Sequence, residues 1–116
     1  MKRPLAYITA AWNGEPDIDT ALAVQFCRIV YEAGFSPICP MLYLPLIVND
    51  ANPEEHKDGS DMRRDMLRRA RVLVVCGEGM DEDVKNDIAV AQRLNITATT
   101  LDGILAVNQQ GRNGTD

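Results

Sequence analysis

Apolar residues fall into four short runs along the chain, and longer amphipathic segments separate them. Residues 5–11 (LAYITAA) and 72–76 (VLVVC) are nearly unbroken apolar runs, which is typical of strands buried on both faces of a parallel sheet. Residues 35–39 and 96–101 predict two further strands, and Pro37 indicates that the first of these lies at a sheet edge.

The segments between the predicted strands follow the helical period. Residues 17–33, 61–70 and 83–94 each place apolar side chains along one face, which predicts three helices. Gly34 stands where a glycine ends many helices. The candidate N-cap residues are Asp17 or Asp19, Ser60 and Asp83.

Strands that alternate with helices predict an α/β fold: a three-layer, flavodoxin- or Rossmann-like open parallel sheet of about four strands with helices on both faces. Residues 1–107 are predicted to form one domain, and the polar residues 108–116 a disordered tail. Ligands of open parallel sheets bind beyond the carboxyl ends of the strands. We therefore expect a cleft lined by the loops at residues 12–16, 40–57 and 77–83.

Residues 40–57 form an unusual connection, because they combine large apolar side chains, three prolines and an acidic end. A loop of this length in a compact domain is often functional. Two interpretations stay open, an apolar lid over the cleft and an oligomer contact. Because a small core would leave these apolar residues poorly covered, we expect a homo-oligomer.

Composition narrows the function classes. A net charge of −5 argues against a nucleic-acid binder, which needs a basic face. No apolar run is long enough for a membrane span, so we expect no membrane partner and a cytoplasmic location. Three cysteines without a CxxC pair predict buried, reduced thiols and no metal site. The arginines between residues 63 and 71 are interpreted as a solvated helix face, partly neutralised by nearby acids.

The remaining polar residues favour carboxylate chemistry. His56 is the only histidine, so a serine–histidine–carboxylate triad is excluded. The GEGM loop that begins at Gly77 resembles a phosphate cradle only loosely, and no cofactor motif follows it. Carboxylates beside an aromatic platform suit cleavage of a glycosidic bond. The residues expected at the cleft for this chemistry are Tyr7, Trp12, Asp61, Asp81, Asp83 and Asp87.

From about Leu5 to Leu101, the sequence resembles the nucleoside 2-deoxyribosyltransferase-like superfamily, especially its small, uncharacterised bacterial and phage branch, DUF4406 and DUF7768. The segments that carry the resemblance are YITAAWNGE, GFSPICPMLYLP, DMLRRARVLVVCG and VKNDIAVAQRLNI. The resemblance implies a two-step displacement at a 2-deoxyribosyl group. It gives Asp87 the role of nucleophile, Tyr7 that of its orienter, and Asp61 that of a contact to the leaving base.

The resemblance also implies that Asp81 or Asp83 makes a further contact to the base. Three positions depart from the family pattern. Asp87 replaces a glutamate, so its carboxylate is one methylene shorter, and a displacement near 1 Å can cost about 10²-fold in rate. Asp83 and Val84 replace a glycine–methionine pair, and Met41 replaces a histidine. The cleft could therefore keep its shape while its chemistry has changed.

We accordingly predict an enzyme that transfers or hydrolyses the N-glycosidic bond of a nucleoside- or nucleotide-like small molecule, with Trp12 as a stacking wall. Further ligand contacts are expected at Asn13, Gly14, Met41 and Gly77. One alternative is a module that binds a nucleotide or nucleobase derivative without catalysis. Another is an interaction domain whose residues 41–48 form an oligomer interface.

Overall fold

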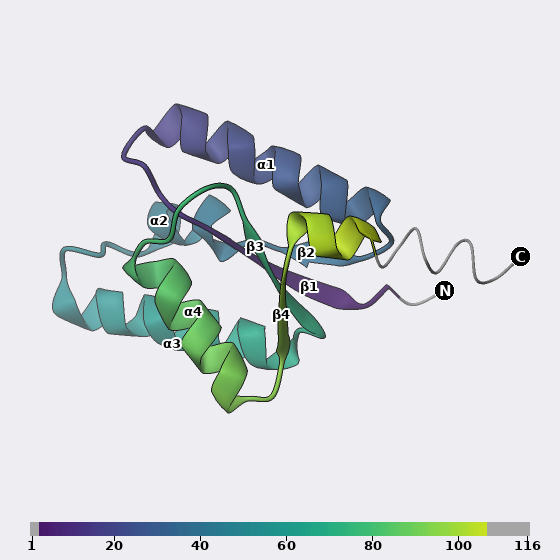
Figure 1. Ribbon diagram of the computed structural model, residues 1–116. Coiled ribbons are helices and arrows are strands. Elements are labelled where there is room, and N and C mark those ends of the chain that lie inside the picture. The colour runs from purple at the N-terminus through teal and green to yellow at the C-terminus, as the bar shows by residue number, and fades with distance from the viewer. Residues whose placement is uncertain (1–2, 107–116) are drawn as a thin grey trace, which may run out of the picture.

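The computed structural model describes residues 3–106 (Figure 1). The predicted tail at residues 108–116 lies outside the described part. Residues 101–106 are helical, although the sequence pattern predicts no helix there. The elements, in chain order, are β1 (Leu5–Ala10), α1 (Pro16–Glu32), β2 (Ser36–Ile38), the 3₁₀ turn η1 (Pro40–Leu42), α2 (Leu44–Ile47), α3 (Pro53–Arg69), β3 (Val72–Cys76), α4 (Glu82–Arg93) and β4 (Thr97–Thr100).

The four strands form one parallel sheet in the order β2-β1-β3-β4, which confirms the predicted α/β fold. Strand β2 lies at an edge, as Pro37 indicated. The chain proceeds outward in opposite directions from the β1–β3 pair, so this pair is the switch point of the sheet. Connections leave the sheet on opposite sides there and open a crevice at the carboxyl edge.

Alternate residues of the central strands pack against different helices. Ala6 and Ile8 of β1 face α1 and the helical residues 101–106, and belong to one buried cluster with them. Tyr7 and Leu73 face the opposite side and share a second cluster with residues of α3 and α4. Figure 1 shows the two helical layers, with α1 above the sheet and α3 and α4 below it. The three-layer prediction is therefore confirmed.

Helix α3 begins eight residues earlier than predicted. The side chain of Asn52 accepts hydrogen bonds from the backbone N–H groups of Glu54 and Glu55, and Pro53 occupies the first turn. These are strong helix-start features, since Asn is a good N-cap and proline lacks the N–H that would otherwise be unpaired. The predicted start at Ser60 is therefore wrong, and residues 53–57 are not part of a long loop.

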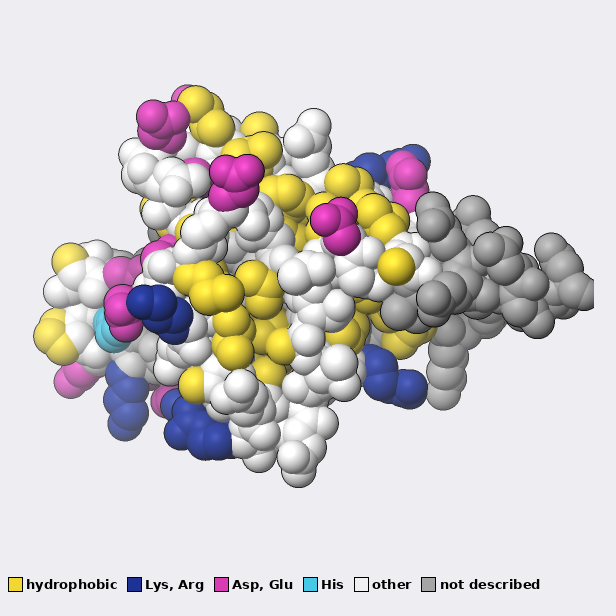
Figure 2. Space-filling model, viewed as in Figure 1, with side chains coloured by type: hydrophobic (Ala, Val, Ile, Leu, Met, Phe, Trp, Pro, Cys, Tyr) yellow, Lys and Arg dark blue, Asp and Glu magenta, His cyan; other side chains and the backbone are white. Residues whose placement is uncertain are grey.

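Several large apolar side chains are exposed. Ile18 and Leu22 belong to the apolar face predicted for residues 17–33, but they are exposed on α1, whereas Ala23 and Val30 are buried. Figure 2 shows hydrophobic side chains along α1 on the visible face. In α2, Leu46 is 83% exposed. The homo-oligomer stays a prediction, which a sizing experiment would test.

Over residues 3–106, no helix has both the length and the apolar character needed to cross a membrane.

Candidate functional site

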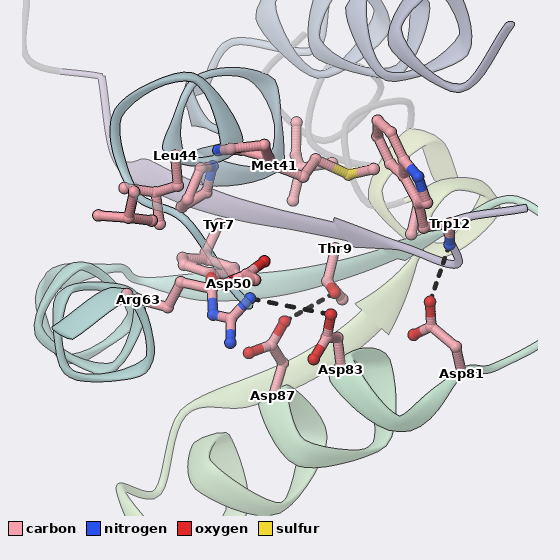
Figure 3. A pocket seen from close by; sticks show the side chains of 16 residues that line it. Tyr7, Thr9, Trp12, Met41, Leu44, Asp50, Arg63, Asp81, Asp83 and Asp87 are labelled. Carbon is pink, nitrogen blue, oxygen red and sulfur yellow. Dashed lines mark hydrogen bonds and ion pairs between the residues drawn. The ribbon is translucent and has the colours of Figure 1, made fainter. Parts of the chain in front are cut away.

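A pocket of about 260 Å³ opens at the carboxyl edge of the sheet, beside the switch point between β1 and β3 (Figure 3). Its floor is the end of β1, its apolar wall comes from η1 and α2, and its polar side comes from α3 and α4. The lining residues are Tyr7, Ile8, Thr9, Ala10, Trp12, Pro40, Met41, Leu44, Pro45, Val48, Asp50, Gly59, Arg63, Asp81, Asp83 and Asp87.

Asp87 is the buried acid of this pocket. It lies on α4, and its Oδ2 accepts a hydrogen bond of 2.7 Å from the Thr9 hydroxyl of β1. Within the described residues, Oδ1 of Asp87 makes no hydrogen bond, and no buried polar side-chain atom there lacks a partner. Oδ1 is therefore open to the pocket, while Thr9 fixes the orientation of the carboxylate.

The surroundings of Asp87 set its charge. The pKa of Asp87 is raised from 3.8 to about 6. Burial is the main cause and the charges of Asp83 and Asp81 add to it, whereas the Thr9 hydrogen bond and the Arg63 charge act in the opposite direction. The carboxylate is thus mainly ionised at pH 7, and it takes up a proton in mildly acidic solution. A group with this behaviour can act as a nucleophile or as an acid–base catalyst near neutral pH.

Tyr7 borders the same pocket from the middle of β1. Burial, and next the charge of Asp87, raise the pKa of Tyr7 above its ordinary value, so the hydroxyl stays protonated and can donate a hydrogen bond. In the part of the chain that the structure covers, this hydroxyl makes no hydrogen bond of its own, and Thr9 is the group that holds Asp87. Thr9 could have been found from the sequence, because residues two apart in a strand share a face.

Arg63 lines the pocket, and the interpretation of this arginine as part of a solvated face is wrong. Because α3 begins at Pro53, Gly59 and Arg63 lie four residues apart on the face that also carries Leu67, which is buried. The Arg63 guanidinium pairs with Asp83 of α4 at 3.8 Å.

Asp61, in contrast, does not line the pocket. It lies in the middle of α3, where its side chain is exposed. Each helical residue turns by about 100°, so Asp61 points about 200° away from both Gly59 and Arg63, which do line the pocket. The structure therefore does not bring Asp61 together with Tyr7 and Asp87.

Asp81 joins the loops that follow β1 and β3. Its Oδ1 accepts the backbone N–H of Val84 at 2.9 Å, and its Oδ2 accepts that of Trp12 at 2.8 Å. Asp81 is therefore the N-cap of α4, and the prediction that Asp83 caps this helix is wrong. The backbone of Asp81 is extended, as an N-cap requires, whereas Asp83 already belongs to the first turn.

The other predicted ligand contacts lie beside the pocket. Asn13 and Gly77 line an adjoining hollow, and Met41 borders both spaces. The buried carboxylate of Asp19 accepts the backbone N–H of Asn13 at 3.1 Å and thereby fixes the loop after β1. Gly14 lines neither space among those described; its φ of +84° fits a turn that glycine tolerates easily.

None of the three cysteines lines the pocket. All three are free thiols, and Cys39 and Cys76 are buried. Burial raises the pKa of Cys76 to about 12, so this thiol is protonated at neutral pH. In residues 3–106, no group of three or more His, Cys, Asp or Glu side chains is arranged to hold a metal ion.

Comparison with known families shows which family the chain belongs to. The family DUF7768, described as a domain of unknown function, matches residues 4–101. The chain belongs to the DUF7768 family. The match runs from just before β1 to just after β4, so it includes every residue that lines the pocket. No curated protein matches the chain.

Proposed function

We propose that the pocket is the active site of an enzyme that transfers or hydrolyses the N-glycosidic bond of a nucleoside- or nucleotide-like small molecule. The observation that carries this proposal is the carboxylate of Asp87. It is buried, it is oriented by Thr9 at 2.7 Å, and its second oxygen is open to a small pocket. Such a carboxylate suits attack on an anomeric carbon.

In the proposed reaction, Oδ1 of Asp87 forms a bond to the anomeric carbon while the bond from that carbon to the base nitrogen breaks. The electron pair of the broken bond leaves with the base, which takes up a proton from water. Water or a second base then attacks the same carbon while its bond to Oδ1 breaks, which restores the carboxylate and yields the free sugar or a new nucleoside. The attacking molecule gives its proton to the hydroxide left when water protonated the first base. Tyr7, whose hydroxyl stays protonated, can donate a hydrogen bond to the sugar or to Asp87.

The walls of the pocket support a ligand with a flat apolar part and a polar edge. Met41 and Leu44 supply an apolar wall, and Trp12, which is 37% exposed, stands at the rim where a ring can stack. Arg63 and Asp83 supply donors and acceptors on the opposite side (Figure 3). A volume of about 260 Å³ is slightly below the range of pockets for drug-sized ligands, which favours a small molecule.

The resemblance to the nucleoside 2-deoxyribosyltransferase-like superfamily supports the same proposal. The positions that the resemblance gives to a nucleophile and to a tyrosine, Asp87 and Tyr7, line one pocket. Asp61 has no part in the proposal, because it lies outside the pocket. The contact to the leaving base is proposed instead for Asp83 and Arg63.

The test is to incubate the purified protein with deoxynucleosides and their 5′-monophosphates, alone and with a second base, and to separate the products by chromatography. Released or exchanged base is the expected result, and Asp87→Ala should abolish it. Activity that persists unchanged in Asp87→Ala would contradict the proposed nucleophile. A correctly folded wild-type protein without activity on the whole panel would contradict the proposed reaction.

The second candidate is a module that binds the same class of ligand without catalysis. Two observations favour it: Asp87 is only 7% exposed, and its side chain is one methylene shorter than the glutamate of the superfamily. A reactive carboxylate has to reach its target closely. A rise in melting temperature with one ligand of the panel, without any product, would decide for binding.

A further inference from the structure

Arg63 differs from the arginines near the end of the same helix. Its side chain is 22% exposed, whereas those of Arg68 and Arg69 are 61% and 69% exposed. A partly buried guanidinium loses hydration, and fixed groups must compensate for the loss. The position of Arg63 therefore reflects the pocket and not the solubility of the helix.

A single ion pair connects Arg63 to α4. The contact to Oδ2 of Asp83 measures 3.8 Å, which is longer than a hydrogen bond, and Nη2 of Arg63 donates to the Ser60 hydroxyl of its own helix at 3.3 Å. In Figure 3, the guanidinium and the carboxylates of Asp83 and Asp87 point toward one another across the pocket. Asp83 and Ser60 thus hold the guanidinium of Arg63 in front of the buried carboxylate of Asp87.

The other charged groups around Asp87 oppose its ionised form. Burial removes water from its carboxylate, and additional carboxylates nearby repel its charge. Among the lining residues that the structure describes, Arg63 is the one with a positive charge, and the other charged residues are aspartates. Besides Asp87, the charged and titratable residues that line the pocket are Tyr7 of β1, Asp50 before α3, Arg63 of α3, and Asp81 and Asp83 at the start of α4. The Asp50 carboxylate lies 3.5 Å from the imidazole of His56.

We propose that Arg63 is a positioning residue: held in place by Asp83 and Ser60, it supplies the positive charge that keeps the buried carboxylate of Asp87, which Thr9 orients, in its ionised form. The inference rests on the proposed function only in that it takes Asp87 to be the nucleophile. The electrostatic coupling itself does not depend on any reaction. Its sign agrees with the surroundings, since the Arg63 charge lowers the pKa of Asp87 against the effect of burial.

The experiment follows the side-chain carboxyl carbon of Asp87 by ¹³C NMR during a pH titration of the wild type and three variants. In Arg63→Met, the titration midpoint of Asp87 should rise by about one pH unit, because an opposite charge is lost. In Arg63→Lys, which keeps a positive charge, most of this rise should disappear. Arg64→Met removes an exposed charge from the neighbouring position and should leave the midpoint unchanged.

A midpoint in Arg63→Met equal to that of the wild type would overturn the proposal. An equal rise in Arg64→Met would overturn it too, because the effect would then follow net charge and not position. If Arg63→Met does not fold, Arg63→Gln tests the same point with a polar side chain. The titration gives its answer whether or not glycosidic activity is found, so the failure of the proposed reaction and the failure of this inference are distinguishable.

Discussion

Asp81, the N-cap of α4, and Asp87, within the same helix, show that two aspartates close in sequence can have different roles. Asp81, at the junction of the loops after β1 and β3, uses both oxygens to accept backbone N–H groups, those of Trp12 and Val84. Asp87, on the pocket side, uses one oxygen for Thr9 and leaves the other open. The two carboxylates differ in whether an oxygen is left to meet a ligand, and not in how close they lie to the sheet edge.

This comparison extends to Asp19 of α1. Its carboxylate is buried like that of Asp87, yet it accepts the backbone N–H groups of Asn13 and Glu15. A carboxylate that satisfies backbone donors stabilises a loop, whereas one with an open oxygen in a pocket can meet a ligand. We therefore interpret Asp19 and Asp81 as loop anchors and Asp87 as the reactive group.

The largest expected effect is on catalysis. Asp87→Asn keeps the shape of the side chain and an acceptor for Thr9, but removes the nucleophile. Base release should fall by about 10³-fold or more, since losing a nucleophile or its partner commonly costs that much. The rate is measured with excess ligand at pH 7, beside the melting temperature of the same sample. A full rate in a folded Asp87→Asn variant would place the chemistry elsewhere.

For Asp81, which anchors the loops after β1 and β3, we expect a loss of stability instead of a loss of catalysis. Asp81→Ala leaves the N–H groups of Val84 and Trp12 without their partner, and the loss of an N-cap costs about 1–2 kcal/mol. The free energy of unfolding should fall by this amount in a urea titration at pH 7. Asp83→Ala is the matched control, because Asp83 belongs to the first turn but caps nothing, so its unfolding midpoint should change less. Equal losses in both variants would contradict the assignment of the cap.

The charge of Asp87 predicts a pH-dependent stability. Its pKa is raised from 3.8 to about 6 on folding, so the folded state binds the proton more tightly. The stabilisation is complete below the unfolded value and is lost as pH rises through about 6. Subtracting the unfolding curve of Asp87→Asn from that of the wild type isolates this group. The wild type should lose about 2 kcal/mol relative to Asp87→Asn between pH 4 and pH 7. A flat or rising difference would show that the carboxylate is not buried as described.

The sequence predicts the sheet better than it predicts the polar side of the pocket. Strand β3 matches its predicted bounds, residues 72–76, because an unbroken apolar run stands between Arg71 and Gly77. Asp87 was expected at the cleft because it stands one turn after the predicted cap, Asp83, and because the resemblance gives it the role of nucleophile. The cap is Asp81 instead, but Asp87 still lines the pocket. Thr9 follows from the period of two in β1, once Tyr7 is placed at the cleft.

Arg63 could not be predicted in the same way, because its orientation depends on where α3 begins. The residues before Ser60 are polar and include Gly59, which costs a helix about 1 kcal/mol relative to alanine. In the structure, Gly59 is buried, and a β-carbon there would lie 3.5 Å from Val48. Tertiary packing of this kind overrides the local propensity. The helix therefore begins at Pro53, and Arg63 falls on the pocket face.

The smallest expected effect concerns the one aspartate that the sequence placed at the cleft and the structure does not. Asp61 is exposed on α3, with its side chain turned away from the pocket-lining Gly59 and Arg63. Exposed substitutions away from special features usually change stability by no more than about 0.5 kcal/mol. We expect Asp61→Asn to keep base release within about twofold of the wild type, since 0.5 kcal/mol corresponds to about that factor. Rates of Asp61→Asn and Asp87→Asn measured side by side at pH 7 make the comparison direct. If Asp61→Asn lost as much activity as Asp87→Asn, α3 would have to turn in the ligand-bound state, and the pocket as described would not be the catalytic one.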